Sequence, residues 1–571
     1  MGPTTEIGQW MHGWKYRGDG ESYEEFCNRF CAAVMDSPQH FRHFRGITRD
    51  QRFLAGGRVQ SAMGSPRAVT PYNCFVSDTI DDSMGSILKV FGEAVMTMRE
   101  GGGEGYDFSN LRPHGDRIKS LGSVASGPVS FMGIFDAGCK TIASAGHRRG
   151  AQMAVLRVDH PDIERFIYAK QNTTNLTAFN ISIGVTDVFM EAVRDGRQFE
   201  LKFQGEGRGM IDARALWEKI MRSTWDWAEP GVLFIDRINT QNNLWYCETI
   251  SATNPCGEQP LPPNGACLLG SFNLTKYISA GMDPTGEQYV FDYETLQEDI
   301  PSVVRAMDNV VDRARYPLRE QEEEALSKRR MGLGVTGLAN SGEALGLPYG
   351  SPGFLEFQRT VMTLIRNDCY AASVELAKEK GPFPLFDKEK YVNAPFIQTL
   401  PRDLIEEIAE HGIRNSHLLS VAPTGTISIA ADNVSSGIEP VFSHRYDRTV
   451  QTEAGPRVVA VEDYALREWG VLGKSADQCS ADDHLNVLLV ASELVDSAVS
   501  KTCNVSPTMD WEDFKAIYMR AWKGGAKGCT TFNSGGKRFG IFEATPAPEV
   551  ATEVGAEACY IDPLTNERSC E

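Results

Sequence analysis

The chain has 571 residues and a formal charge of −19, with 42% hydrophobic and 23% charged residues, a composition typical of a soluble globular protein. This length predicts one large domain or two ordinary ones. The acidic balance argues against a surface for nucleic acids or anionic membranes, and no stretch reaches the ~20 apolar residues of a membrane span. A nucleotide ligand stays open, because a few local donors suffice to bind a phosphate.

The thirteen cysteines are scattered along the chain and form no CxxC pair. This pattern fits neither a secreted disulfide scaffold nor a zinc ribbon, and we expect no metal site. The N-terminal residues lack the apolar core of a signal peptide. We therefore expect a cytoplasmic protein (in the host cytoplasm if the chain is viral) whose thiols stay reduced and serve in part for chemistry.

Helical patterns and short apolar runs alternate along the chain, which predicts the α/β class and allows a barrel. Apolar residues recur at helical spacing in four segments, at residues 22–44, 84–99, 294–313 and 354–380. Short apolar runs predict strands at residues 72–76, 180–185, 231–235, 332–335 and 418–421.

Residues 253–274, TNPCGEQPLPPNGACLLGSFNL, form the most informative segment. Asn254, Cys256 and Glu258 occupy alternate positions, so in an extended or gently looped backbone their side chains point to the same side. The prolines and glycines of the segment forbid a regular helix, and Cys267 follows within a dozen residues. The segment is therefore predicted to be a reactive loop held by a scaffold.

Three further loops carry residues suited to phosphate groups. The glycines at 101–103 lack a complete phosphate-loop pattern, so their signal is weak. In GHRRG, at 146–150, Arg148 and Arg149 suit either bidentate phosphate contacts or a solvated turn. At 421–442 a predicted strand runs into PTGTIS and a small-residue helix, whose N-terminus favours an anion site, although a capped helix without a ligand fits as well.

Three cysteines outside the reactive loop need an interpretation. Cys74 falls on or beside a predicted buried strand, where a small core residue is the simpler reading. After Gly540 the sequence becomes rich in Pro, Ala and Glu, which is typical of disordered chain. This tail carries Cys559 and Cys570, and thiols on a disordered arm favour a redox role.

Taken in order, these motifs resemble those of ribonucleotide reductase catalytic subunits from about residue 51 onward. The resemblance rests on PYNCFVSDTIDDS, GHRRGAQM, NPCGEQPL with the downstream GAC, APTGTIS followed by SSGIEP, and the cysteine-bearing tail. It is closest to class II, which depends on adenosylcobalamin, although no DxHxxG cobalamin motif is present. It implies conversion of ribonucleotides to 2′-deoxyribonucleotides by thiyl-radical chemistry, for DNA precursor synthesis.

The resemblance also implies the fold, a ten-stranded α/β barrel with a central finger loop. The expected organisation is a helical N-terminal region at 1–60 without an ATP cone, a catalytic barrel with effector loops at 61–540, and a flexible redox tail at 541–571.

The family's site residues can be carried over position by position. Cys256 would form the thiyl radical that abstracts the substrate 3′-hydrogen, Glu258 would be the general base on the 3′-hydroxyl, and Asn254 would hydrogen-bond the reacting hydroxyls. Cys74 and Cys267 would reduce the 2′ position and end as a disulfide. The tail pair Cys559 and Cys570, spaced more widely than is usual in the family, would re-reduce that disulfide.

Two nucleotide sites follow from the same resemblance. The residues expected at the substrate phosphates are Pro423, Thr424, Gly425, Thr426 and Ser428. A deoxynucleotide or ATP effector is expected to bind Asp81, Asp82, Ser83, Arg148 and Arg149. The family's monomeric members carry a large insertion that this sequence lacks, so we expect a homodimer with the 84–99 helix in its interface.

The source of the radical leaves an alternative within the family. Many class I members relay the radical from a separate small, metal-bearing subunit through a tyrosine pair, and Thr530, Thr531 and Phe532 stand at that place here. Neither Thr nor Phe oxidises easily, which favours adenosylcobalamin. A class I catalytic subunit is the alternative, and whether the substrate is a diphosphate or a triphosphate stays open.

Two other classes of protein explain the sequence less well. A cysteine hydrolase would need a histidine base for Cys256, and none of the ten histidines stands in a recognisable partner motif. A redox-regulated nucleotide-binding protein would leave Asn254 and Glu258 unexplained. In the favoured reading, a thioredoxin- or glutaredoxin-like protein is the reductant.

Overall fold

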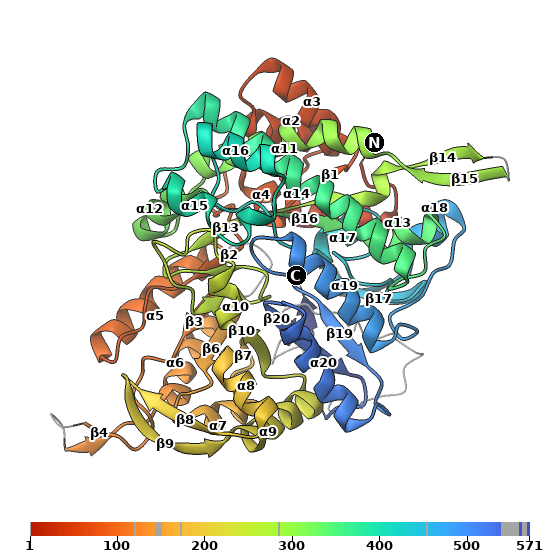
Figure 1. Cartoon of the computed structure of the whole chain (residues 1–571). Coiled ribbons are helices and arrows are strands. Elements are labelled where there is room, and N and C mark those ends of the chain that lie inside the picture. The colour runs from red at the N-terminus through yellow and green to blue at the C-terminus, as the bar shows by residue number, and fades with distance from the viewer. Residues whose placement is uncertain are drawn as a thin grey trace.

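A computed structural model describes residues 2–118, 122–142, 151–171, 174–283, 286–452 and 455–537, together with the backbone of two short strands at 559–561 and 568–570. Helices surround one large sheet, and the predicted α/β class is confirmed (Figure 1). Within the described residues, no helix combines the length and the apolar character needed to cross a membrane.

The principal sheet contains ten strands in two parallel sets. The first set, in spatial order, is β2 (Cys74–Val76), β3 (Gly103–Asp107), β6 (Gln152–Arg157), β7 (Phe179–Val185) and β10 (Gly231–Phe234). The second set pairs β13 (Ala266–Asn273) with β16 (Met331–Thr336), and β19 (Thr502–Val505) with β20 (Gly528–Asn533). Antiparallel pairs β2–β13 and β10–β20 join the two sets, and β1 (Phe53–Ala55) adds to β13.

Single backbone bridges lead from β16 back to β19. Leu333 of β16 bridges Leu419, and Val421 bridges Val499, both in parallel. The N–H of Val421 donates to the carbonyl of Ala498 at 3.1 Å. Residues 419–421 and 497–500 therefore link the two ends of the sheet through bridges rather than through a continuous ladder, along the path that a barrel requires.

A short hairpin enters the space that these strands surround. Its strands β11 (Ala252–Thr253) and β12 (Pro260–Leu261) pair antiparallel and carry residues 254–259 at the tip, the predicted finger loop. A Cβ on Gly105 of β3 would lie 1.9 Å from the Thr253 carbonyl oxygen, and one on Gly103 would lie 3.1 Å from the Pro255 ring. Glycine at 103 and 105 therefore lets the hairpin approach the sheet, which gives this glycine-rich run a packing role.

Two long helices cover one part of the sheet, α11 (Tyr293–Arg313) and α14 (Pro352–Lys380), and both were predicted. In α14 the Ser351 hydroxyl accepts the Phe354 N–H at 3.3 Å, Pro352 occupies the first turn, and Gly381 follows the last residue. Their apolar stripes bury into one core cluster, which also receives β13 and β16. A second cluster packs α6 (Pro128–Thr141), α9 (Ala213–Trp227) and α20 (Trp511–Lys523) on the other strands.

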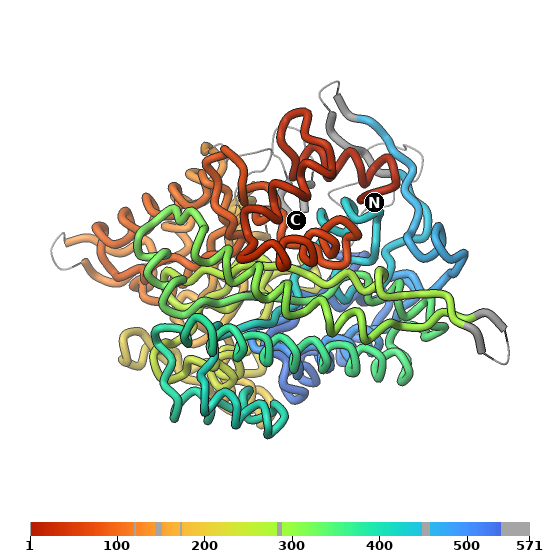
Figure 2. Tube along the Cα trace, turned by 90° about the horizontal axis from the view of Figure 1, so that it is seen from above, coloured from red at the N-terminus to blue at the C-terminus, as the bar shows by residue number. Residues whose placement is uncertain are grey.

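The N-terminal helices are α1 (Glu6–Tyr16), α2 (Tyr23–Val34), α3 (Pro38–Arg49) and α4 (Gly57–Ala62), and α2 and α3 match the prediction for 22–44 (Figure 2). The Asp432 carboxylate fixes the start of α1, because it accepts the N–H groups of Thr4 at 2.9 Å and Thr5 at 2.8 Å and both hydroxyls. Asp432 follows α17 (Gly425–Ala430), so α1 is tied to the PTGTIS segment. The domain boundaries stay predictions.

Candidate active site

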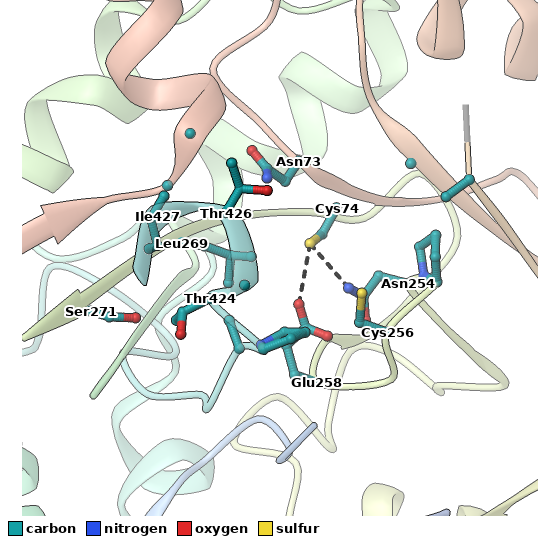
Figure 3. Close-up of a pocket in the computed structure, with 18 of the residues that line it drawn as sticks. Asn73, Cys74, Asn254, Cys256, Glu258, Leu269, Ser271, Thr424, Thr426 and Ile427 are labelled. Atoms are coloured by element: carbon teal, nitrogen blue, oxygen red, sulfur yellow. Dashed lines mark hydrogen bonds between the residues drawn. The ribbon is translucent and has the colours of Figure 1, made fainter. Parts of the chain in front are cut away.

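A cavity lies at the tip of the finger loop, and together with the open solvent at its mouth it encloses about 790 Å³ of empty space. The finger loop, the start of β2, the middle of β13 and the loop entering α17 all contribute to its lining (Figure 3). Its lining includes Asn254, Pro255, Cys256, Glu258, Asn73, Cys74, Leu269, Gly270, Ser271, Ala422, Pro423, Thr424, Gly425, Thr426 and Ile427.

The Asn254 side chain shapes the finger loop from within. Its carbonyl oxygen accepts the N–H of Gln259 at 2.9 Å, and its backbone N–H donates to the Gln259 carbonyl at 3.0 Å. Its amide nitrogen donates to Cys74 Sγ at 3.1 Å. Gly257 takes φ +83° in the turn, a conformation that favours glycine. One side chain thus closes the loop and binds a cavity thiol.

Two contacts from outside hold the residues that flank Cys256. The Asn180 side chain of β7 donates to the Pro255 carbonyl at 3.0 Å, and the Ala498 N–H donates to the Glu258 carbonyl at 2.9 Å. Cys256 itself is partly exposed and lines the cavity. Its thiol is therefore presented from a loop whose backbone is fixed on both sides.

Glu258 is 1% exposed, and its Oε1 accepts a hydrogen bond from the Cys74 thiol at 3.8 Å. Burial raises the pKa of Glu258 to about 7, against the opposing effect of hydrogen bonds from Asn254 and Cys74. Its Oε2 has no hydrogen-bond partner within the described part of the chain. A carboxyl group with a pKa near neutrality and a vacant acceptor in a cavity is suited to general acid–base catalysis.

Cys74 of β2 and Cys267 of β13 are direct cross-strand partners in the antiparallel pair. Such partners project on the same face, with Cβ atoms about 4.5–5.5 Å apart, close to what a disulfide requires. Both thiols are buried, and burial raises the pKa of each well above its ordinary value. Cys74 lines the cavity, so its position differs from the simpler interpretation of a residue that only packs in the core.

The PTGTIS segment supplies one wall of the cavity. Thr424 takes φ +57°, and its hydroxyl accepts the Gly437 N–H at 2.7 Å and lies 3.0 Å from the Thr336 hydroxyl. Pro423, Thr424, Gly425 and Thr426 line the cavity. The structure does not place Ser428 in the lining, because its hydroxyl turns back to donate to the Thr424 carbonyl at 2.5 Å.

Of the predicted effector residues, Asp81, Asp82 and Ser83 are not among those that line this cavity. Ser83 caps α5 (Met84–Arg99) by accepting the Ser86 N–H at 3.2 Å, and Asp81 and Asp82 precede it. The Asp82 carboxylate binds the Arg112 guanidinium at 2.7 Å. Arg148 and Arg149 lie outside the described residues, and the effector site stays a prediction.

The tail cysteines are described by their backbone only. The strands β21 (Cys559–Ile561) and β22 (Arg568–Cys570) pair antiparallel, with Cys559 opposite Cys570.

The segment at 530–532 lies in β20, where the Thr531 hydroxyl is 2.9 Å from that of Tyr518. No group of three or more His, Cys, Asp or Glu side chains suited to a metal ion occurs among the described residues.

Several cavity residues were missed from the sequence. Tyr16 at the end of α1, Gly56 and Gly57 at the start of α4, and Asn73 all line the cavity. Nothing in the local pattern around Tyr16 indicates this position. The glycines at 101–103, which also line the cavity, had drawn notice only as an incomplete phosphate-loop pattern.

A cavity thiol with a cross-strand thiol partner, a third thiol on a fixed loop and a buried carboxyl group are typical of a thiol-dependent oxidoreductase. Residues 72–472 and 471–532 match the family model described as ribonucleotide reductase, barrel domain. The chain therefore belongs to the ribonucleotide reductase family, as the sequence motifs predicted.

Curated relatives fall in the same family. The chain is 36% identical over 540 residues to the vitamin B12-dependent ribonucleoside-diphosphate reductase of Mycobacterium tuberculosis (strain CDC 1551 / Oshkosh), covering 89% of this chain and 74% of that protein. A protein of the same name from Thermoplasma acidophilum is 34% identical over 508 residues, covering 83% and 62%. The ribonucleoside-diphosphate reductase large subunit of vaccinia virus is 27% identical over 423 residues, covering 66% and 53%.

Proposed function

We propose that the chain is a class II ribonucleotide reductase, which replaces the 2′-hydroxyl of a ribonucleotide by hydrogen and depends on adenosylcobalamin. The observation that carries this proposal is the convergence of Cys256, Glu258 and Cys74 on one cavity, with Cys267 paired to Cys74 across the β2–β13 ladder. The relatives named vitamin B12-dependent favour class II over the class I alternative.

The residues divide the chemistry as follows. The Cys256 thiyl radical removes the 3′-hydrogen atom, Glu258 takes the proton of the 3′-hydroxyl, and Asn254 orients the reacting hydroxyls. The 2′-hydroxyl leaves as water, and Cys74 and Cys267 supply two electrons and two protons as they join in a disulfide. At the end Cys256 returns the hydrogen atom to C3′ and is again a thiyl radical, so the net reaction consumes one dithiol for each deoxynucleotide.

The cavity also suits the cofactor's adenosyl arm. Cys256 is partly exposed in a cavity that glycines at 56–57 and 101–103 also line, so its thiol is accessible to a group bound there. Adenosylcobalamin, when bound, supplies the one-electron chemistry that takes the hydrogen atom from a thiol. The protein's part is to present the Cys256 thiol from a fixed loop and to exclude water from it. The phosphates of the substrate would meet the N–H groups at the start of α17.

The decisive experiment supplies the purified chain with adenosylcobalamin, a ribonucleotide, a deoxynucleotide effector and a dithiol. Deoxynucleotide formation that depends on the cofactor supports class II. Inactivity that is relieved by a metal-loaded small subunit would assign the chain to class I. Nucleotide binding without product under either condition would favour the redox-regulated binding protein.

The pKa of Glu258 gives a pH prediction. Burial favours the neutral form, so the ionised base is lost as the pH falls below about 7, and single-turnover rates should fall with it. Glu258→Gln should lower the rate by about 10²- to 10⁴-fold and remove this pH dependence. Pre-reduced enzyme, quenched after one turnover at pH 5.5 to 8.5, avoids the ionisation of the dithiol. A rate independent of pH over that range would exclude Glu258 as the base.

The tail is proposed to recycle the cavity disulfide in a cytoplasmic setting, with a thioredoxin- or glutaredoxin-like protein as the final reductant. The opposed positions of Cys559 and Cys570 in β21 and β22 support their partnership despite their wide spacing in sequence. One tail thiolate attacks the Cys74–Cys267 disulfide and the second tail thiol resolves the mixed disulfide, so the tail becomes oxidised as the cavity pair is reduced.

Cys559→Ala should leave single turnover intact and prevent recycling by thioredoxin, and a small dithiol should restore it. The measurement is product per enzyme over time with each reductant. Cys247→Ala, which removes an exposed thiol outside the cavity lining, is the matched control and should cycle normally. Undiminished thioredoxin-driven turnover in Cys559→Ala would remove the tail from the pathway.

The homodimer is proposed to form through α5 and α6. Met84, Leu88 and Met96 of α5 and Ile134 of α6 are exposed apolar residues on these two packed helices. An apolar surface of this kind marks an interaction site, and a second copy suits it because the effector residues at 81–83 begin the same helix.

Leu88→Glu should therefore convert a dimer to a monomer, because it places a charge within the apolar interface. Sedimentation velocity with and without effector measures the change. Val188→Glu, at an equally exposed apolar residue on α8 (Asp187–Asp195), is the control and should not alter the mass. A wild-type chain that stays monomeric at all concentrations would contradict the proposal.

A further inference from the structure

Lys527 brings a buried positive charge beneath the active site. Its side chain is 3% exposed, and its ammonium group donates to three successive carbonyls, those of Val495 at 3.2 Å, Asp496 at 2.6 Å and Ser497. Burial lowers the pKa of Lys527 to about 8, against the opposing charge of Asp496. A buried ammonium group is strongly unfavourable without such acceptors, so the cation and the backbone of 495–497 hold each other in place.

The residues bound by Lys527 continue directly into the catalytic machinery. The N–H of Ala498 donates to the carbonyl of Glu258 at 2.9 Å, and the carbonyl of Ala498 accepts the N–H of Val421 at 3.1 Å. Ala498, which directly follows the residues bound by Lys527, therefore contacts both the finger loop and the strand that leads into Pro423 and Thr424.

Asp496 fastens the same segment from its other side. Its carboxylate accepts the N–H groups of Leu418 at 2.7 Å and Leu419 at 2.9 Å, and the Tyr370 hydroxyl at 2.8 Å. The Ser497 N–H donates to the Leu419 carbonyl at 3.0 Å. Residues 495–498 thus form a brace between the strand at 418–421 and the finger loop, with Lys527 at its centre.

We propose that Lys527 is a positioning residue for the reaction. By holding the carbonyls of 495–497, Lys527 places Ala498 against the backbone of Glu258. It also fixes the strand at 418–421, which leads into Pro423 and Thr424. The role rests on the proposed function of the cavity, and it concerns a residue that belongs to none of the catalytic motifs. The segment that Lys527 holds contacts both the backbone of Glu258 and the strand at 418–421, so a change at Lys527 is expected to affect both parts of the site and not only the stability of the protein.

Lys527→Met tests this role, because methionine has a similar length and no donor. We expect kcat to fall by about 10- to 100-fold, the order produced by small misplacements of reacting groups. We also expect KM to rise, because the loop at 423–426 becomes less well held. Amide hydrogen exchange should quicken in residues 254–259 and 495–500 and stay unchanged in α11. Lys527→Gln, which keeps an N–H donor, should recover part of both losses and gives a second variant if the methionine form folds poorly.

Val304→Ala, a cavity-forming change in the α11 core, is the control for lost stability. At a matched loss of Tm it should keep kcat and KM near the wild-type values. The proposal is overturned if Lys527→Met keeps wild-type kcat and KM per folded enzyme, or if exchange in 254–259 does not change. Inactivity of the wild-type chain would instead count against the proposed function, and the exchange measurement would still decide the role of Lys527.

Discussion

Cys256→Ser is expected to abolish deoxynucleotide formation, with a loss of at least about 10⁴-fold, the scale seen when the central group of a catalytic unit is removed. The reaction needs a hydrogen atom to leave the side chain and return to it in each cycle. An O–H bond is too strong for this exchange under the same conditions, whereas an S–H bond permits it. Serine is nearly isosteric, so the loop should keep its shape.

Nucleotide binding separates this loss from misfolding. Asn180 and Ala498 hold the backbone on either side of Cys256, so Cys256→Ser should bind substrate within about twofold of the wild-type affinity, a difference of under 1 kcal/mol. Equilibrium dialysis measures binding, and Cys247→Ser is the control with full activity expected. Substantial turnover by Cys256→Ser would refute the thiyl mechanism.

Cys74→Ser and Cys267→Ser carry the second large effect, because each removes one half of the dithiol that is oxidised. Both variants should fail to cycle with any thiol reductant, and product should not exceed about one equivalent per site. The cross-strand register of the pair explains why neither can be replaced, since no other described cysteine faces Cys74 across this ladder.

Product per enzyme over many minutes is the measurement. Cys369→Ser in α14 gives a matched control, because it places a hydroxyl at an equally buried thiol outside the cavity and should continue to cycle. Continued cycling by either cavity variant would remove that residue from the reducing pair, while leaving the roles of Cys256 and Glu258 intact.

Local patterns predicted the parts of this site that lie close together in sequence. The alternate spacing of Asn254, Cys256 and Glu258 reflects a short loop between two strands, and that loop is present. The predicted strands at 180–185 and 231–235 correspond to β7 and β10 within a residue or two. Periodicity alone allowed a barrel, and the family resemblance supplied the ten-stranded form.

Contacts between distant segments were beyond the reach of such patterns. Tyr16 reaches the cavity only because Asp432 fixes the start of α1, and the two residues are more than 400 positions apart. Nothing in the local sequence marks Lys527, and its carbonyl partners appear only when 495–497 pack against it. The glycines at 101–103 suggest an incomplete phosphate-loop pattern, whereas Gly103, together with Gly105, makes room for the finger loop.

The anchoring of α1 has a practical consequence for handling the protein. Gly2 and Pro3 are buried, the Gly2 N–H donates to the Arg49 carbonyl at 3.0 Å, and Thr4 and Thr5 bind Asp432, which follows α17. An affinity tag fused before Gly2 would disturb the hydrogen bonds that anchor α1, and one fused after Glu571 would lie close to the tail cysteines. The exposed turn at 204–205, between β8 (Gln198–Phe203) and β9 (Glu206–Asp212), is a safer place for a purification handle.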